Sequence, residues 1–198
     1  MIMKFKSFLM LAFVSMFAVA GMTSCSSDDD ELIDESGEII APTIVHKFFG
    51  LSVDELKAKM AQANYSLLSS DNSSDYTSLV FNNNGVEPSK VSFYYEGGKM
   101  VSVEAYVSVN ANNKMSHFNK WDAIMYGKKS DFPNFSALND DLKKTYTKHD
   151  EFVATISEKT KSAVETMSNS KQAIILTIYD HNLTYYFGPV GRCDNIVR

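Results

Sequence analysis

Cysteine is scarce in this chain, which has only Cys25 and Cys193 among its 198 residues. Neither belongs to a CxxC motif or pairs with a histidine at metal-ligand spacing, so a disulfide-rich scaffold and the common zinc motifs are excluded. Arginine is equally scarce, and no run of basic residues is longer than two. Because a nucleic-acid binder needs a basic face that displaces counterions from phosphates, we predict no nucleic-acid partner.

The sequence also lacks the motifs of the common catalytic sites. It contains no GxSxG nucleophile elbow, no P-loop and no GxGxxG segment. The four histidines fall in separate segments and form no HxxxH or HExxH pair: His46, His117, His149 and His181. Cys193 lies in a polar C-terminal stretch, where an unreactive thiol is the simpler interpretation. We therefore predict no catalytic residue, no metal and no cofactor.

What the sequence does contain is a three-part N-terminal leader. Lys4 and Lys6 form a short positive region, and the thirteen apolar residues 8–20 follow. That run has the length of a signal-peptide core and is too short to span a bilayer. The small residues of Gly21-Met22-Thr23-Ser24 then lead directly to Cys25.

This leader resembles the lipobox of bacterial lipoproteins, although Met22 stands where leucine is commoner. The resemblance implies that residues 1–24 are removed and that Cys25 receives a diacylglycerol, which anchors the chain to a membrane. Residues 25–41 then form an acidic tether that we expect to be disordered. The tether contains seven acids: Asp28, Asp29, Asp30, Glu31, Asp34, Glu35 and Glu38.

The acidic run immediately after Cys25 is similar to that of surface-exported lipoproteins of the Bacteroidetes. This similarity implies an outer-membrane location, with the cell surface favoured over the periplasmic face. A self-repelling spacer without any export role is the simpler alternative. From Ile39 onward acidic and basic residues balance, so the charge excess belongs to the tether.

Residues 42–198 are long enough for one domain with its own core. We predict an α+β fold: an antiparallel sheet with helices packed on one face, in two layers. The first helix is predicted over 53–64, because Ser52 and Glu55 have capping-box spacing. Apolar periodicity predicts further helices over 114–126, 137–146 and 151–168. The last segment can also be interpreted as two strands.

Two hairpins are predicted from alternating apolar residues. For 91–96 and 100–109, a two-residue Gly97-Gly98 turn would set Glu96 opposite Lys99. We favour a three-residue loop, which pairs Phe93 with Val103 and Tyr95 with Val101 and gathers the branched apolar residues on one face. For 174–179 and 183–187, a His181-Asn182 turn pairs Ile178 with Tyr185 and Leu176 with Phe187.

These registers send four tyrosines to the face of the sheet away from the aliphatic core: Tyr94, Tyr106, Tyr179 and Tyr186. Tyrosine has a rigid apolar ring with a polar tip, which suits a binding surface. Exposed sheets also carry tyrosine through β-propensity alone. We identify this tyrosine face as the candidate binding surface.

The sequence thus favours a non-catalytic binding module, displayed on the outer membrane, for a glycan, a peptide or a partner protein. A structural or assembly lipoprotein in the periplasm is the alternative. A hydrolase whose site is assembled only on folding is the least favoured function.

Overall fold

The computed structural model describes residues 40–73, 76–83 and 87–191. The predicted leader, Cys25, nearly all of the predicted tether and Cys193 lie outside these residues. In the part of the chain that is described, no helix combines the length and apolar character needed to cross a membrane.

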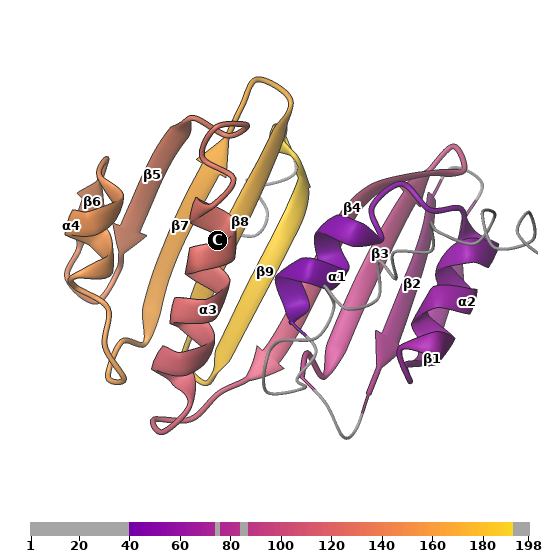
Figure 1. Ribbon diagram of the computed structural model, residues 1–198, viewed down its shortest axis with the longest axis horizontal. Coiled ribbons are helices and arrows are strands. Elements are labelled where there is room, and N and C mark those ends of the chain that lie inside the picture. Colours follow the sequence, from indigo (N-terminus) through magenta and orange to yellow (C-terminus); the bar gives the residue numbers. More distant parts are fainter. Residues whose placement is uncertain (1–39, 74–75, 84–86, 192–198) are drawn as a thin grey trace, which may run out of the picture. The chain divides into compact units, whose positions relative to one another are not determined.

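Nine antiparallel strands form one sheet, in the order β1-β2-β3-β4-β9-β8-β7-β5-β6 (Figure 1). The strands are β1 (Ser66–Asn72), β2 (Tyr76–Asn82), β3 (Lys90–Glu96), β4 (Lys99–Ser108), β5 (Asn134–Asn139), β6 (Lys144–Tyr146), β7 (Ser162–Ser168), β8 (Gln172–Tyr179) and β9 (Asn182–Pro189). Strands β1 to β4 lie side by side in the order of the sequence. The chain then reaches the opposite edge and returns through β7 and β8, so that β9 pairs with β4 in the interior of the sheet.

Four short helices accompany the sheet among the described residues: α1 (Ala41–Lys47), α2 (Val53–Gln62), α3 (Lys114–Tyr126) and α4 (His149–Val153). Helix α1 packs on β4 and β9, and α3 packs on β8 and β9. Helix α2 contacts β1, while α4 contacts β5 and β6. Figure 1 shows α3 crossing in front of the β7–β9 half of the sheet.

Alternation along the strands builds the main core. In β4, Val103, Ala105 and Val107 are buried on the side that faces the helices. They join one apolar cluster with Phe118 and Trp121 of α3. Burial of these side chains stabilises the fold by about 25 cal/mol for each Å² of apolar surface removed from water. The helices therefore cover the face of the sheet that carries the apolar side chains.

The predicted fold class is wrong. The domain is mostly sheet, with about 43% of its described residues in strands and 25% in helices. It is therefore not the two-layer α+β domain that the periodicity indicated, because two of the predicted helical segments add strands to the sheet.

The first of these segments, 137–146, forms part of β5 and all of β6 around a turn in which Lys143 has a φ of +52°. In the second, 151–168, only the start is helical, as the end of α4, and its end forms β7. Glu165 explains the second error, because it is 1% exposed at a position that an alternating strand would assign to the core. A glutamate there hides the strand pattern.

The predicted helices 53–64 and 114–126 correspond to α2 and α3. Ser52 and Glu55 form the capping box in both directions. The favoured hairpin register is correct for Phe93 with Val103 and wrong for Tyr95, which pairs with Met100. A two-residue Gly97-Gly98 turn, with both glycines at positive φ, is followed by a bulge that restores the alternation.

The second hairpin turns one residue earlier than predicted. Its turn is Asp180-His181, with Asp180 at a φ of +52°. Leu176 therefore pairs with Tyr185 rather than with Phe187. Moving the turn by one residue shifts the pairing by two, and so every side chain keeps its predicted face.

Candidate functional site

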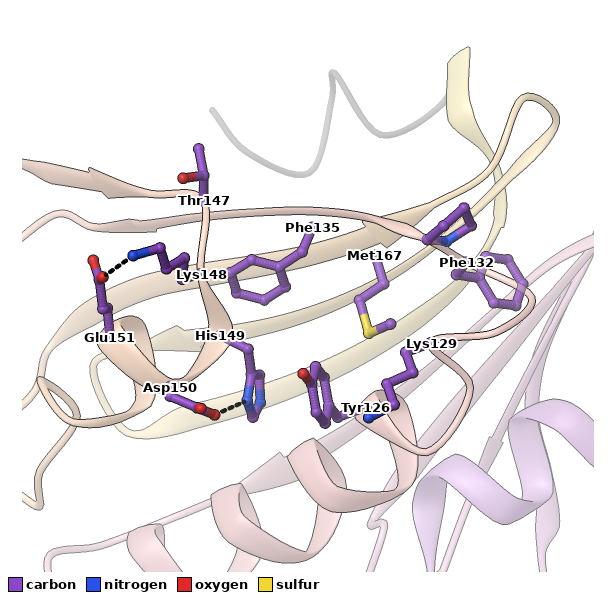
Figure 2. A pocket seen from close by; sticks show the side chains of 11 residues that line it. Tyr126, Lys129, Phe132, Phe135, Thr147, Lys148, His149, Asp150, Glu151 and Met167 are labelled. Atoms are coloured by element: carbon purple, nitrogen blue, oxygen red, sulfur yellow. Dashed lines mark hydrogen bonds and ion pairs between the residues drawn. The ribbon is translucent and has the colours of Figure 1, made fainter.

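A cavity of about 580 Å³ opens beside α4, between the end of α3 and the β5–β7 edge of the sheet (Figure 2). Its apolar lining comes from Tyr126, the last residue of α3, from Phe135 of β5 and from Met167 of β7. Phe132 and Pro133, in the connection between α3 and β5, complete that lining. We call this cavity the His149 pocket, after the histidine described next.

The polar residues of the pocket carry charges of both signs. Lys148 and Glu151 form an ion pair at 2.8 Å, seen as a dashed line in Figure 2. Lys129 lies over the ring of Tyr126, with its Nζ 4.8 Å from the ring centroid. Thr147 also lines the pocket and is exposed. The positive charge of Lys148 is therefore balanced within the pocket itself.

His149 is held from several sides. Its imidazole stacks on the ring of Tyr126, with centroids 3.7 Å apart and planes 11° from parallel. Phe135 meets the same imidazole edge-on at 5.7 Å. Its Nε2 lies 2.7 Å from Oδ1 of Asp122, and its Nδ1 lies 3.3 Å from Oδ1 of Asp150. The orientation of this ring is thus fixed before any ligand arrives.

Two carboxylates lie close to the imidazole of His149. Asp122 of α3 is buried, and Glu165 of β7 points from the sheet toward the helices. Their oxygens and the imidazole nitrogen lie within 4.8 Å of one another. Burial raises the pKa of Glu165 well above its usual range, and the negative charge of Asp122 adds to the shift. These three groups come from α3, α4 and β7.

A second polar pair, which is partly buried, joins β9 to α1. His46 Nε2 and the hydroxyl of Tyr185 lie 2.7 Å apart. Burial lowers the pKa of His46 to about 3, and the charge of Lys128 acts in the same direction. Burial also raises the pKa of Tyr185 well above its usual range, and the negative charge of Glu165 contributes. The core face therefore carries polar side chains from α1, β7 and β9.

The structure places the four predicted tyrosines on one face of the sheet. Along β4 and β9, Glu104 is opposite Tyr186 and Tyr106 is opposite Thr184. Tyr179 is 69% exposed, while Tyr94 and Tyr106 are half-buried. Tyr186 differs, because it is only 3% exposed and packs in a small cluster with Ala173 and Ile175. Three of the four rings therefore remain accessible.

Two of the accessible tyrosines, Tyr94 and Tyr106, interact with neighbouring side chains. Tyr106 donates a hydrogen bond to the side-chain oxygen of Asn182, and Lys90 Nζ lies 4.8 Å from the centroid of the Tyr106 ring. Burial raises the pKa of Tyr94, and the nearby charge of Glu104 raises it further. The surroundings of Tyr94 and Tyr106 are therefore polar, whereas Tyr186 packs in an apolar cluster.

The structure separates the four histidines. His117 pairs with Glu87 at 2.6 Å, His181 lies in an exposed turn, and the half-buried His46 contacts Tyr185. Only His149 joins a group that could hold a metal ion, within the part of the chain that the structure covers. Sequence reasoning missed that group, because Asp122, His149 and Glu165 are far apart in the chain and share no motif.

Comparison with known proteins adds no relative from which a function could be transferred. No family model, no curated protein and no solved structure matches the chain.

Proposed function

We propose that this protein is a lipid-anchored outer-membrane protein, displayed at the cell surface, whose domain binds a glycan in the His149 pocket. The leader and acidic run around Cys25 support the anchor and the location. The observation that supports the binding role is the pocket itself. Its lining combines aromatic rings, including Tyr126 and Phe135, with charged side chains of both signs at its rim. Its volume of about 580 Å³ lies in the range of small-ligand sites.

The composition of the pocket favours a neutral, amphiphilic ligand. The paired Lys148 and Glu151 leave little net charge on their side of the rim to attract an anion. The rings of Tyr126 and Phe135 offer apolar surface for the faces of sugar rings, while the rim supplies hydrogen-bonding groups for hydroxyls. A glycan combines both requirements in one molecule.

A blocking substitution tests this proposal on the full chain in detergent. Thr147→Trp places a large side chain at the exposed rim, and we expect it to abolish binding to ligands found on a glycan array. Thr145→Trp is the matched control, since Thr145 is exposed on β6 and does not line the pocket. Equal glycan binding by both variants, or no glycan binding by the unmodified chain, would contradict the proposal.

The tyrosine face is a second candidate for the contact with a ligand or partner protein. The observation in its favour is that Tyr179 is 69% exposed beside two further accessible tyrosines on the same face. A purely structural role in the periplasm is the alternative to both. Protease treatment of intact cells separates these locations, because a periplasmic protein would be protected from digestion.

A further inference from the structure

We propose that Asp122, His149 and Glu165 bind a divalent transition-metal ion. The three side chains come from α3, α4 and β7, and their candidate ligand atoms lie within 4.8 Å of one another. One imidazole nitrogen with two carboxylates is a ligand set that Zn²⁺ accepts and that Mn²⁺ and Fe²⁺ also use.

The distances are compatible with one shared ion. Two atoms that each lie ~2.0–2.1 Å from the same Zn²⁺ are at most ~4 Å apart. The observed group is within 4.8 Å, so side-chain shifts of about 1 Å would bring all three ligands onto one ion. His149 Nε2 and Asp122 Oδ1 are already 2.7 Å apart.

The buried carboxylate of Glu165 is an independent indication of a cation. Glu165 is 1% exposed, and neither of its oxygens accepts a hydrogen bond from any described residue. A carboxylate removed from water is costly unless a charge or hydrogen-bond donors replace the solvent. The buried ammonium of Lys114, at the start of α3, is bonded to the carbonyl oxygen of Thr160 at 2.8 Å rather than to Glu165. A metal ion would supply the missing positive charge.

The imidazole is arranged as metal-binding histidines usually are. Such a histidine donates its other ring N–H to a carboxylate or carbonyl, which leaves the opposite nitrogen free for the metal. In this site Asp150 accepts at Nδ1 at 3.3 Å, and Nε2 faces Asp122. Both ring nitrogens are thus directed at aspartates, and Glu165 receives no hydrogen bond from this ring.

An ion in this position would join α4 to α3 and to β7. Three protein ligands leave at least one coordination position for water or another molecule. Since His149 also lines the pocket, the ion would stand beside the proposed glycan site. The inference does not depend on glycan binding, because the metal is measured alone and without any ligand in the pocket.

The test uses the full chain, stripped with a chelator and then titrated with ZnCl₂, MnCl₂ or MgCl₂ by calorimetry. Bound metal is counted by elemental analysis after dialysis. We expect one Zn²⁺ or Mn²⁺ per chain and much weaker binding of Mg²⁺. Glu165→Gln should weaken binding by at least about 100-fold, since loss of even an outer-shell partner costs roughly 10–100-fold.

His117→Gln is the matched control, because His117 also pairs with a carboxylate, that of Glu87, away from this site. It should leave the affinity unchanged. Glu165→Gln removes a buried charge, so we expect it to fold, which circular dichroism checks. Unchanged affinity in Glu165→Gln, or loss of affinity in His117→Gln, would place the ion elsewhere and overturn the proposal.

Co²⁺ gives a second measurement that needs no variant. Bound at this site, it should give visible absorption bands of a nitrogen and oxygen ligand set, which excess Zn²⁺ abolishes. If the unmodified chain takes up neither Zn²⁺, Mn²⁺ nor Co²⁺ at one per chain, the proposal is wrong.

Discussion

The ring of Tyr126 stacks on the imidazole of His149 at a centroid distance of 3.7 Å, and so joins the end of α3 to the start of α4. Stacked rings contribute about 0.5–1.5 kcal/mol beyond their buried area. We expect Tyr126→Leu to lower the free energy of unfolding by about 1 kcal/mol, whereas Tyr126→Phe, which keeps the ring, should change it little. Urea unfolding measures both. Equal losses in the two variants would show that the stack contributes nothing.

His46 predicts a loss of stability in acid. Its pKa is lowered to about 3 in the folded protein, from 6.5. Between these two values the unfolded chain binds the extra proton and the folded chain does not, so stability decreases as pH falls from 6.5 toward 3. A shift of this size corresponds to at most about 5 kcal/mol.

A substitution isolates that contribution. His46→Gln keeps a side chain that can bond to the Tyr185 hydroxyl but cannot titrate in this range. Urea unfolding between pH 7 and 4 should show a shallower decline for this variant than for the unmodified chain. Parallel declines would mean that His46 does not contribute to the acid sensitivity.

Substitutions of the tyrosines on the tyrosine face should lower the free energy of unfolding by unequal amounts. Tyr179→Ala should change the free energy of unfolding by less than about 0.5 kcal/mol, because the ring is mostly exposed. Tyr186→Ala should cost about 3–5 kcal/mol, because that ring is buried. Phe93→Ala and Leu176→Ala, on the core face, should each cost about 2–5 kcal/mol. Chemical denaturation gives all four values, and a large cost for Tyr179→Ala would show that its ring is covered in solution.

Gly188, on the same face of the sheet, has no room for a larger side chain. A Cβ at this position would meet the hydroxyl and ring of Tyr186 and the Cβ of Ser102. We expect Gly188→Ala to lower the free energy of unfolding by about 1–3 kcal/mol through overpacking. Gly191→Ala is the control, since a Cβ there meets nothing within 4 Å. If both alanine variants unfold at the same urea concentration, Tyr186 has room to move aside.

The anchor prediction assigns the lipid to Cys25. In cells supplied with labelled palmitate, the unmodified chain should become labelled and Cys25→Ala should not. Cys193→Ala is the control for other thiol chemistry and should keep the label. Full labelling of Cys25→Ala would end the lipoprotein interpretation.

Local patterns in the sequence were sufficient where neighbouring residues decide the structure. Helices α2 and α3 follow from capping and apolar spacing, and the Phe93–Val103 pairing follows from strict alternation. Each of these depends on interactions within about a dozen residues. The faces of both hairpins were predictable for the same reason, even where a turn was displaced by one residue.

The remainder depends on contacts between distant segments. Strand β7 lies in a segment for which strands were only the alternative to the favoured helix, because Glu165 is an acidic residue at a buried strand position. Its burial depends on distant segments of the chain, which local periodicity does not show. The group of Asp122, His149 and Glu165 could not be predicted for a similar reason. Asp122 and His149 are brought together by the packing of α3 and α4 and not by their spacing in the sequence. The residue that concealed the strand is also a member of the site.

The pairing of β9 with β4 has a consequence for incomplete chains. Strand β4 ends at Ser108, but its partner β9 begins only at Asn182. A chain that lacks β9 would leave one edge of β4 unpaired, and unpaired edges favour pairing with another chain. Chains cut short before Asn182 are therefore expected to aggregate more readily than the full chain.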